Sequence, residues 1–178
     1  LCTLALALLA PSQALADSGS EITAITGCGV AQTFLGLGDV AWYTPVPGGT
    51  FTSASWSVSG GARIVRDELD GDAALRLDEA QSGAGSFVCR DTLLPLVRFS
   101  VRNAGATTGR LRVELRYVAP STNANARWVT IASIAAGKAW APSAPLAWAT
   151  PATGATLLGM RLTAEGVGAS FRIDDVFV

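Results

Sequence analysis

Short runs of strict alternation between apolar and charged residues constrain the fold of this chain more than any other feature. In residues 111–117, written LRVELRY, every second side chain is apolar and those between are charged. Residues 97–102 and 158–163 alternate in the same way. A period of two is typical of a β-strand with one buried face. Because helical periodicity is hard to find after Ala16, we expect an all-β chain.

The other expected strands are separated by residues that favour turns, mainly Gly, Pro, Ser and Asn. They cover residues 56–59, 62–66, 74–78, 85–90, 126–132 and 171–177. Short strands spaced by about 10 residues are typical of a sandwich. Two facing sheets would bury their apolar sides, so we predict an antiparallel two-sheet β-sandwich. Residues 138–154 are rich in Ala and Pro, and we expect them to form a long, loosely ordered crossing between strands.

Charge and composition exclude several classes of function. The 13 Lys and Arg residues face 14 Asp and Glu residues, and this balance argues against a nucleic-acid-binding protein. Histidine is absent, which excludes Ser-His-Asp catalysis, Cys-His catalysis and histidine metal sites. At 178 residues, we expect a single domain.

The first residues have the pattern of an export signal. Residues 1–10 form an apolar run, and Ala14 and Ala16 are the small residues that a signal peptidase requires. We therefore predict a signal peptide over residues 1–16, with Asp17 as the first mature residue. The alternative is a membrane anchor, but the run is shorter than the roughly 20 apolar residues that span a bilayer. No later stretch is apolar enough to span, so we expect a secreted protein without a membrane span.

Two cysteines, Cys28 and Cys89, follow the predicted signal. An even pair in an exported chain indicates one disulfide, and two separate buried thiols are the alternative. A bridge closing a loop of about 60 residues would stabilise the chain by roughly 4 kcal/mol. It would tie residues 17–44, an N-terminal segment expected to pack on the sandwich through Trp42 and Tyr43, to the domain of residues 45–178.

Four segments share their order with a known class of modules. These are FTSASW at residues 51–56, GDAALRL at 71–77, Trp140, and FRIDDVFV at 171–178. Together they resemble secreted carbohydrate-binding-like, or galactose-binding-like, jelly-roll modules. FLGLGDVAWY at residues 34–43, with PGG at 47–49, resembles uncharacterised secreted actinobacterial proteins of this layout. The resemblance implies a jelly roll with structural roles for Trp56 and Trp140. It implies less about function, because this fold hosts sugar binders, adhesion modules and structural domains alike.

The same resemblance implies a structural calcium ion held by a Glu of the opening motif, the first Asp of the closing motif and main-chain carbonyls. Asp174 matches that Asp, but Thr52 replaces the Glu and so removes a ligand and a charge. The alternative is that Asp174 and Asp175 only accept hydrogen bonds at a sheet edge. We therefore expect no cofactor and little effect of calcium. The acidic residues 67–72 lack a calcium-loop pattern and are expected to form a solvated hairpin loop, with the turn at Asp70 and Gly71.

The candidate ligand site lies on a hairpin around the turn-rich residues 119–125. A register that pairs Val118 with Ala126 keeps both inner faces apolar. That register sets two outward pairs, Arg116 opposite Trp128 and Glu114 opposite Thr130.

Trp128 is predicted to point outward and offer a sugar a flat aromatic face. Arg112, Glu114 and Arg116 would bond the sugar hydroxyls beside it. Arg116 is also expected to make a cation–π contact with Trp128, worth about 0.5–1 kcal/mol. The alternative is that Trp128 only covers a neighbouring loop. Trp148, in the Pro-rich crossing, is expected to be partly exposed and is the second candidate aromatic.

Six arginines are expected on outward faces: Arg98, Arg102, Arg112, Arg116, Arg161 and Arg172. Such a face is interpreted as a soluble sheet surface, with recognition of acidic sugars as the alternative. Glu114 lies between Arg112 and Arg116, which favour an ionised carboxylate over a general acid. A pair of catalytic carboxylates, as glycoside hydrolysis needs, is therefore not expected.

The sequence thus predicts a secreted, non-catalytic module that binds carbohydrate or another extracellular surface ligand. Its partner would be a polysaccharide or a cell-surface glycan. One alternative is a structural or cell-surface sandwich with no small ligand. The other is a small polysaccharide-active enzyme.

Overall fold

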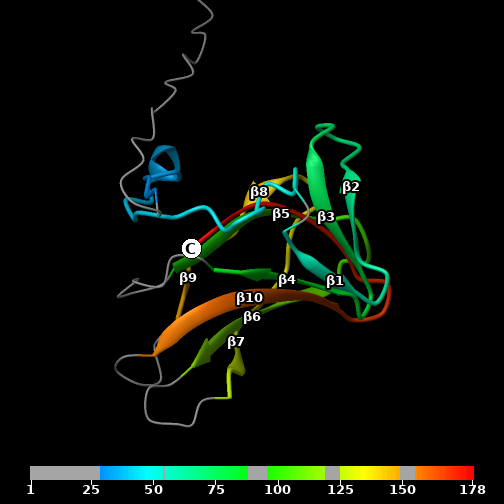
Figure 1. Ribbon diagram of the computed structural model, residues 1–178. Helices are drawn as coiled ribbons and strands as arrows, with labels where there is room; N and C mark the ends of the chain where they lie inside the picture. The colour runs from blue at the N-terminus through cyan, green and yellow to red at the C-terminus, as the bar shows by residue number, and fades with distance from the viewer. Residues whose placement is uncertain (1–28, 54, 88–95, 119–124, 149–154) are drawn as a thin grey trace, which may run out of the picture.

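Two antiparallel sheets packed face to face make up the protein (Figure 1). The computed structural model describes residues 29–53, 55–87, 96–118, 125–148 and 155–178. In spatial order the first sheet contains β1 (Ser57–Ser59), β4 (Ser82–Ser86), β10 (Thr156–Glu165), β6 (Arg110–Val118) and β7 (Arg127–Ile134). The second contains β2 (Arg63–Arg66), β3 (Ala73–Asp78), β11 (Ser170–Phe177), β5 (Leu96–Asn103) and β8 (Ala141–Pro142), and β9 (Leu146–Ala147) also pairs with β5. The predicted all-β sandwich is confirmed.

Among the described residues, the only helical element is the single 3-10 turn η1 (Leu35–Leu37). No helix in this part of the chain has the length and hydropathy to cross a membrane. The predicted signal peptide over residues 1–16 lies outside the described residues, and so do Cys28 and Cys89.

The core fills the space between the two sheets with alternate side chains of their strands. Inward positions of β6 and β10 are fully buried, and so are those of β5 and β11 opposite them. The buried side chains of these strands include Leu111, Val113, Leu115, Met160, Leu162, Phe99, Phe171 and Ile173. Each pattern has a period of two, so the residues between them point away from the core.

Strand β4 reads SGAGS, and its two glycines make room for large side chains of the core. A Cβ atom at Gly85 would lie 2.7 Å from Cε2 of Trp56, and one at Gly83 would lie 2.7 Å from Cδ2 of Leu75. The sequence prediction placed this strand at residues 85–90, whereas the strand covers Ser82–Ser86. The error arose because glycine is depleted from strands and carries no hydrophobic periodicity. Residues 88–90 lie outside the described residues.

The expected loose crossing over residues 138–154 is wrong for its described part. β8 pairs with β5 through Pro142 and Ser100, and β9 pairs with β5 through Ala147 and Leu96. Two-residue strands are too short to show a period in the sequence, and Pro142 is tolerated because β8 is an edge strand.

The hairpin of β6 and β7 has the predicted register. Arg116 pairs with Trp128, and Glu114 pairs with Thr130. The register then shifts, because the next pair on the inner side is Val113 with Ala132. This β-bulge places one extra residue in β7, which is the edge strand of the first sheet.

The segment before the sandwich lies along β5 and the end of β11 (Figure 1). Tyr43 is fully buried, and its ring meets the edge of Phe34 at 5.2 Å between centroids. The Tyr43 hydroxyl donates to Asp39 Oδ2 at 2.7 Å, and Asp39 forms an ion pair with Arg98 of β5. Trp42 is 64% exposed, so the expectation that it packs with Tyr43 is wrong. The extended backbone turns neighbouring side chains to opposite sides.

A methyl group at Gly85 should destabilise the sandwich. We expect Gly85→Ala to lower the free energy of unfolding by about 1–3 kcal/mol, because the Trp56 ring occupies the space that Cβ needs. Gly137→Ala is the control, since nothing lies within 4 Å of a Cβ at Gly137. Urea unfolding of the two variants measures the difference, and equal stability would contradict this account of β4.

Candidate functional site

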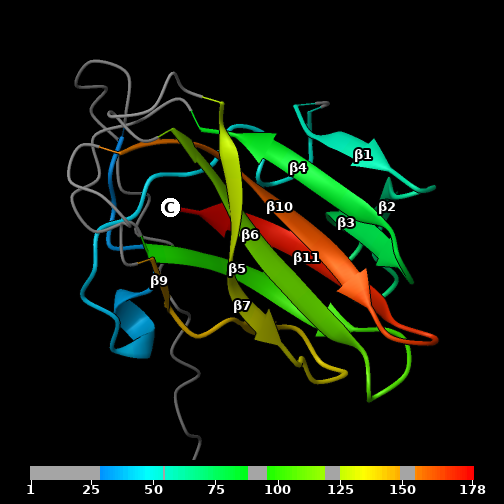
Figure 2. The same ribbon diagram turned by 90° about the horizontal axis from the view of Figure 1, so that it is seen from below.

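The outer face of the first sheet carries most of the predicted ligand residues. Figure 2 shows β4, β10, β6 and β7 side by side in this sheet. Residues on this face lie beside their partners in the neighbouring strands, so the face consists of rows across β4, β10, β6 and β7. One row is Ser86, Gly159, Arg116 and Trp128, and the next is Ala84, Arg161, Glu114 and Thr130. The rows bring an exposed aromatic ring, hydroxyl groups and guanidinium groups onto one surface.

Trp128 points outward as predicted and is 37% exposed. Its cation–π partner is Arg161, with Cζ 4.5 Å from the ring centroid. The prediction that Arg116 makes this contact is therefore wrong. Arg161 lies on β10, diagonally from Trp128, and its long side chain reaches over β6 to the ring. One side of the indole is thus covered by protein, and the exposed part of the ring remains for a ligand.

Glu114 holds Arg161 in this position. Arg161 Nε donates to Glu114 Oε2 at 2.7 Å, and Nη2 donates to Oε1 at 2.9 Å. The hydrogen bonds from Arg161 outweigh the effect of burial and hold the pKa of Glu114 below its usual value. The carboxylate is therefore ionised, as predicted. Glu114 is only 6% exposed, so it is not the open sugar-hydroxyl acceptor that the sequence suggested.

The other two arginines of β6 differ in their partners. Arg112 Nη1 lies 3.0 Å from Glu165 Oε1, and its Nε lies 3.4 Å from Glu114 Oε2. Arg116 is exposed and has no Asp or Glu oxygen within 4.0 Å among the described residues. Of the predicted arginines, Arg116 therefore offers a ligand the more accessible charge.

Trp148, the second candidate aromatic, is not available to a ligand. It is 6% exposed, and its ring lies 5.4 Å from the ring of Tyr117 between centroids. The expectation of partial exposure is wrong, because β9 pairs with β5 directly before Trp148 and carries it into the core.

On β5 and β11, the outer face of the second sheet is covered rather than open, whereas Arg63 on β2 is exposed. Arg98, Arg102 and Arg172 point away from the core but are only 5–6% exposed, so their expected exposure is wrong. The Phe34 ring lies 4.2 Å from Cζ of Arg98. Alternation in the sequence predicts on which side of the sheet a side chain lies, but it does not show which residues pack over that side chain.

Asp67 is a buried carboxylate that binds Arg102 on the outer face of the second sheet. It accepts hydrogen bonds from Arg102 Nε and Nη2 at 3.0 and 2.6 Å, and from Trp140 Nε1 at 3.2 Å. Burial alone would raise the pKa of Asp67, but these bonds and one from the Leu69 amide keep it below its usual value. Residues 67–72 form the expected hairpin loop, yet Asp67 is 2% exposed, so the prediction of a solvated loop is wrong there.

Asp174 and Asp175 lie where β11 loses its regular register with β5. Burial raises the pKa of Asp174 to about 7, and the charges of Asp175, Asp70 and Asp72 add to this effect. The pKa of Asp175 is raised as well, mainly by burial. The described residues contain no group of three or more side chains that could hold a metal ion. Thr52 supplies no carboxylate beside Asp174, and the calcium site at Asp174 stays a hypothesis.

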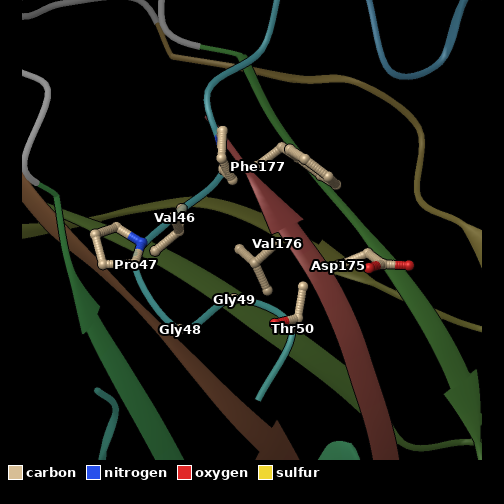
Figure 3. A pocket seen from close by; sticks show the side chains of 9 residues that line it. Val46, Pro47, Gly48, Gly49, Thr50, Asp175, Val176 and Phe177 are labelled. Atoms are coloured by element: carbon tan, nitrogen blue, oxygen red, sulfur yellow. The ribbon is translucent and has the colours of Figure 1, made fainter. Parts of the chain in front are cut away.

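A pocket of about 250 Å³ lies beside the bulge of β11 (Figure 3). It is lined by residues 45–50 and 175–177, and its polar side chains are those of Thr50 and Asp175. Its floor is a close backbone crossing, because a Cβ at Gly49 would lie 2.6 Å from the Val176 carbonyl oxygen. With few polar side chains and no flat exposed ring, it is less suited to a sugar than the face around Trp128.

No protein-family model matches the chain, and no curated protein matches it. Among solved structures, the CBM22-1 and GH10 modules of Clostridium thermocellum endo-1,4-β-D-xylanase 10B, complexed with xylohexaose, align with a TM-score of 0.55 and 16% identity. That alignment covers 69% of this chain and 25% of the other. The CBM22-2 xylan-binding domain of Paenibacillus barcinonensis Xyn10C aligns with a TM-score of 0.51 and 16% identity, over 74% of this chain and 94% of the other.

The enzymatically active domain of tailspike protein 4 from bacteriophage CBA120 aligns with a TM-score of 0.50 and 17% identity, over 72% of this chain and 20% of the other. At these identities the similarity shows the fold alone. The chain has the jelly-roll sandwich fold found in carbohydrate-binding modules, as its motifs indicated. Because only about a fifth of that enzymatically active domain aligns, and because one fold can host unrelated functions, the fold by itself does not decide between binding and catalysis.

Three contributors to the two faces were not recognised in the sequence. Asp67 was assigned to a solvated hairpin loop, Asp39 was given no role, and Arg161 was not linked to Trp128. Their partners lie far along the chain, such as Arg102 for Asp67 and Arg98 for Asp39. A charged residue next to a turn is usually solvated, so no local signal distinguishes these.

The raised pKa of Asp174 should make the protein less stable as the pH rises from about 4 to about 7. The folded pKa is about 7 and the ordinary value is 3.8, so in this window the folded state binds the proton that the unfolded state has lost. Asp174→Asn should flatten the decline and exceed wild-type stability at pH 8. Glu165→Gln, on the other sheet, should keep the wild-type slope. Urea unfolding between pH 4 and 8 tests this, and an unchanged slope in Asp174→Asn would refute it.

Proposed function

We propose that this chain is a secreted, non-catalytic module that binds carbohydrate through the outer face of the first sheet. The observation that carries the proposal is the exposed Trp128, held by Arg161 and Glu114 on an otherwise polar surface. An aromatic ring fixed in this way offers an apolar platform with hydrogen-bonding groups at its edge. A pyranose ring has a matching shape, with an apolar face of C–H groups and a rim of hydroxyls.

The neighbours of Trp128 suit the rim of a sugar. Arg116 lies opposite Trp128 in the pairing of β6 and β7, and Thr130 lies two residues along β7 on the same face. Both are exposed. Gly159 lies beyond Arg116 in the same row and has no side chain to rise above the sheet. Gly159 is itself buried, so the neighbouring side chains that this row offers a ligand are those of Trp128 and Arg116.

The electrostatics of the face support binding without catalysis. A glycosidase needs two carboxyl groups about 5–10 Å apart across the scissile bond, one of them kept protonated. Glu114 is buried and its pKa is lowered, which is the opposite of what a general acid requires. Glu165, at the far end of β10, is bonded to Arg112. These contacts favour a structural role for both carboxylates.

Trp128→Ala should abolish binding to insoluble polysaccharides and to a glycan array, while circular dichroism and the melting temperature stay close to wild type. Trp128→Phe should retain part of the binding, because a smaller flat ring remains. Trp42→Ala is the matched control, since Trp42 is 64% exposed on the N-terminal segment and should not affect binding. Binding that survives in Trp128→Ala would refute this site. A wild-type protein that binds no glycan would favour the structural or cell-surface alternative.

Export and the disulfide can be tested together by one intact-mass measurement. We expect the secreted protein, unfolded without reductant and treated with iodoacetamide, to begin at Asp17 and to carry no alkyl group. Cleavage after Ala16 gives the first result, and a Cys28–Cys89 bridge gives the second. A mass that includes residues 1–10 would contradict export with cleavage. A mass increased by two alkyl groups would contradict the bridge.

A further inference from the structure

We infer that the ligand of the Trp128 face is an acidic polysaccharide, whose uronate carboxylate binds the guanidinium group of Arg116. This inference rests on the proposed function, because it assigns a substrate class to the same face. Three features carry it: the ion pairs of the carboxylates of the face, the exposed guanidinium group of Arg116, which has no Asp or Glu partner among the described residues, and the position of Arg116 relative to Trp128.

The carboxylates of this face are engaged by its own arginines. Both oxygens of Glu114 accept hydrogen bonds from Arg161, and Arg112 lies beside the same carboxylate. Glu165 forms an ion pair with Arg112. Arg161 also lies over the Trp128 ring, so its role is to hold the platform. Around Trp128, the charged group left for a ligand is therefore a cation.

Arg116 is that cation. It is exposed, and among the described residues no carboxylate lies within ion-pair distance of it. An exposed guanidinium has five N–H donors and no acceptor, and it binds a carboxylate through two parallel hydrogen bonds. A neutral hydroxyl has a single oxygen and cannot accept two parallel hydrogen bonds in this way.

The position of Arg116 suits a sugar stacked on Trp128. The two residues are direct partners across the antiparallel pair, so their Cβ atoms lie roughly 5 Å apart. In a uronic acid the carboxylate is attached to the pyranose ring where a neutral hexose has a hydroxymethyl group. A ring on Trp128 can thus bring its carboxylate to Arg116 without leaving the platform.

The experiment compares acidic polymers with their own neutral forms. Polygalacturonate, alginate, hyaluronate and glucuronoxylan are each tested beside the carboxyl-reduced polymer, in which the carboxylate has become a hydroxymethyl group. Affinity electrophoresis or calorimetry at low and high salt measures binding. We expect at least one acidic polymer to bind about tenfold or more tightly than its reduced form, and the difference to shrink as salt rises.

Two variants assign the effect to Arg116. Arg116→Gln should lose about tenfold or more in affinity for the acidic polymer and should bind the reduced polymer as wild type does. Arg63→Gln, an exposed arginine of β2 on the other sheet, is the matched control and should bind both polymers as wild type does. Unchanged melting temperatures show that both variants fold.

The outcomes separate this inference from the proposed function. Equal affinity for the acidic and reduced polymers, lost in Trp128→Ala, would overturn the inference and leave the carbohydrate-binding function standing. Acid-selective binding that Arg116→Gln does not weaken would also overturn it. If no polymer binds in either form, the proposed function fails, and the inference fails with it.

Discussion

The period of two along a β-strand couples the core of this protein to the chemistry of its surface. On β6, Leu111, Val113 and Leu115 are fully buried, so the residues between them must lie on the outer face. A register slip of one residue would bury three charged side chains and expose three apolar ones, at a cost no local contact could offset. The rows that place Trp128 beside Arg116 are therefore held by the packing of the core beneath them.

The two sheets use their outward arginines in different ways. On the second sheet, the N-terminal segment covers Arg98 with Phe34 and Asp39, and the β2–β3 loop gives Arg102 the buried carboxylate of Asp67. Removing one partner from such a buried pair leaves an uncompensated charge at a cost of about 3–5 kcal/mol, so each arginine depends on its carboxylate. The buried arginines are therefore closed to a ligand. On the first sheet the ion pairs are partly exposed and hold an aromatic ring in place. Arginine side chains are thus buried against their partners on the second sheet, whereas on the first sheet an arginine holds the Trp128 ring in place.

Alternation and turn chemistry were enough to predict the strands that carry the site and the register of the β6–β7 hairpin, because both depend on neighbours in the sequence. The prediction failed where an environment is set by distant residues. Trp148 is buried because β9 pairs with β5, and Arg161 reaches Trp128 only because β10 lies beside β6. Gly85 of β4 escaped notice for a related reason, since it leaves space for Trp56, which lies almost thirty positions earlier in the sequence.

The bulge opposite Val113 and Glu114 has a consequence for how copies of this protein behave at high concentration. It lies in β7, whose outer backbone groups are not paired in a ladder with any described strand. If an unpaired edge strand is flat and regular, it can pair with the edge strand of another molecule and begin aggregation. The extra residue interrupts the ladder and increases the local twist, while Arg127 places a positive charge at the start of the strand. The strand that displays Trp128 is thereby protected from self-association, so its aromatic surface can stay open to solvent.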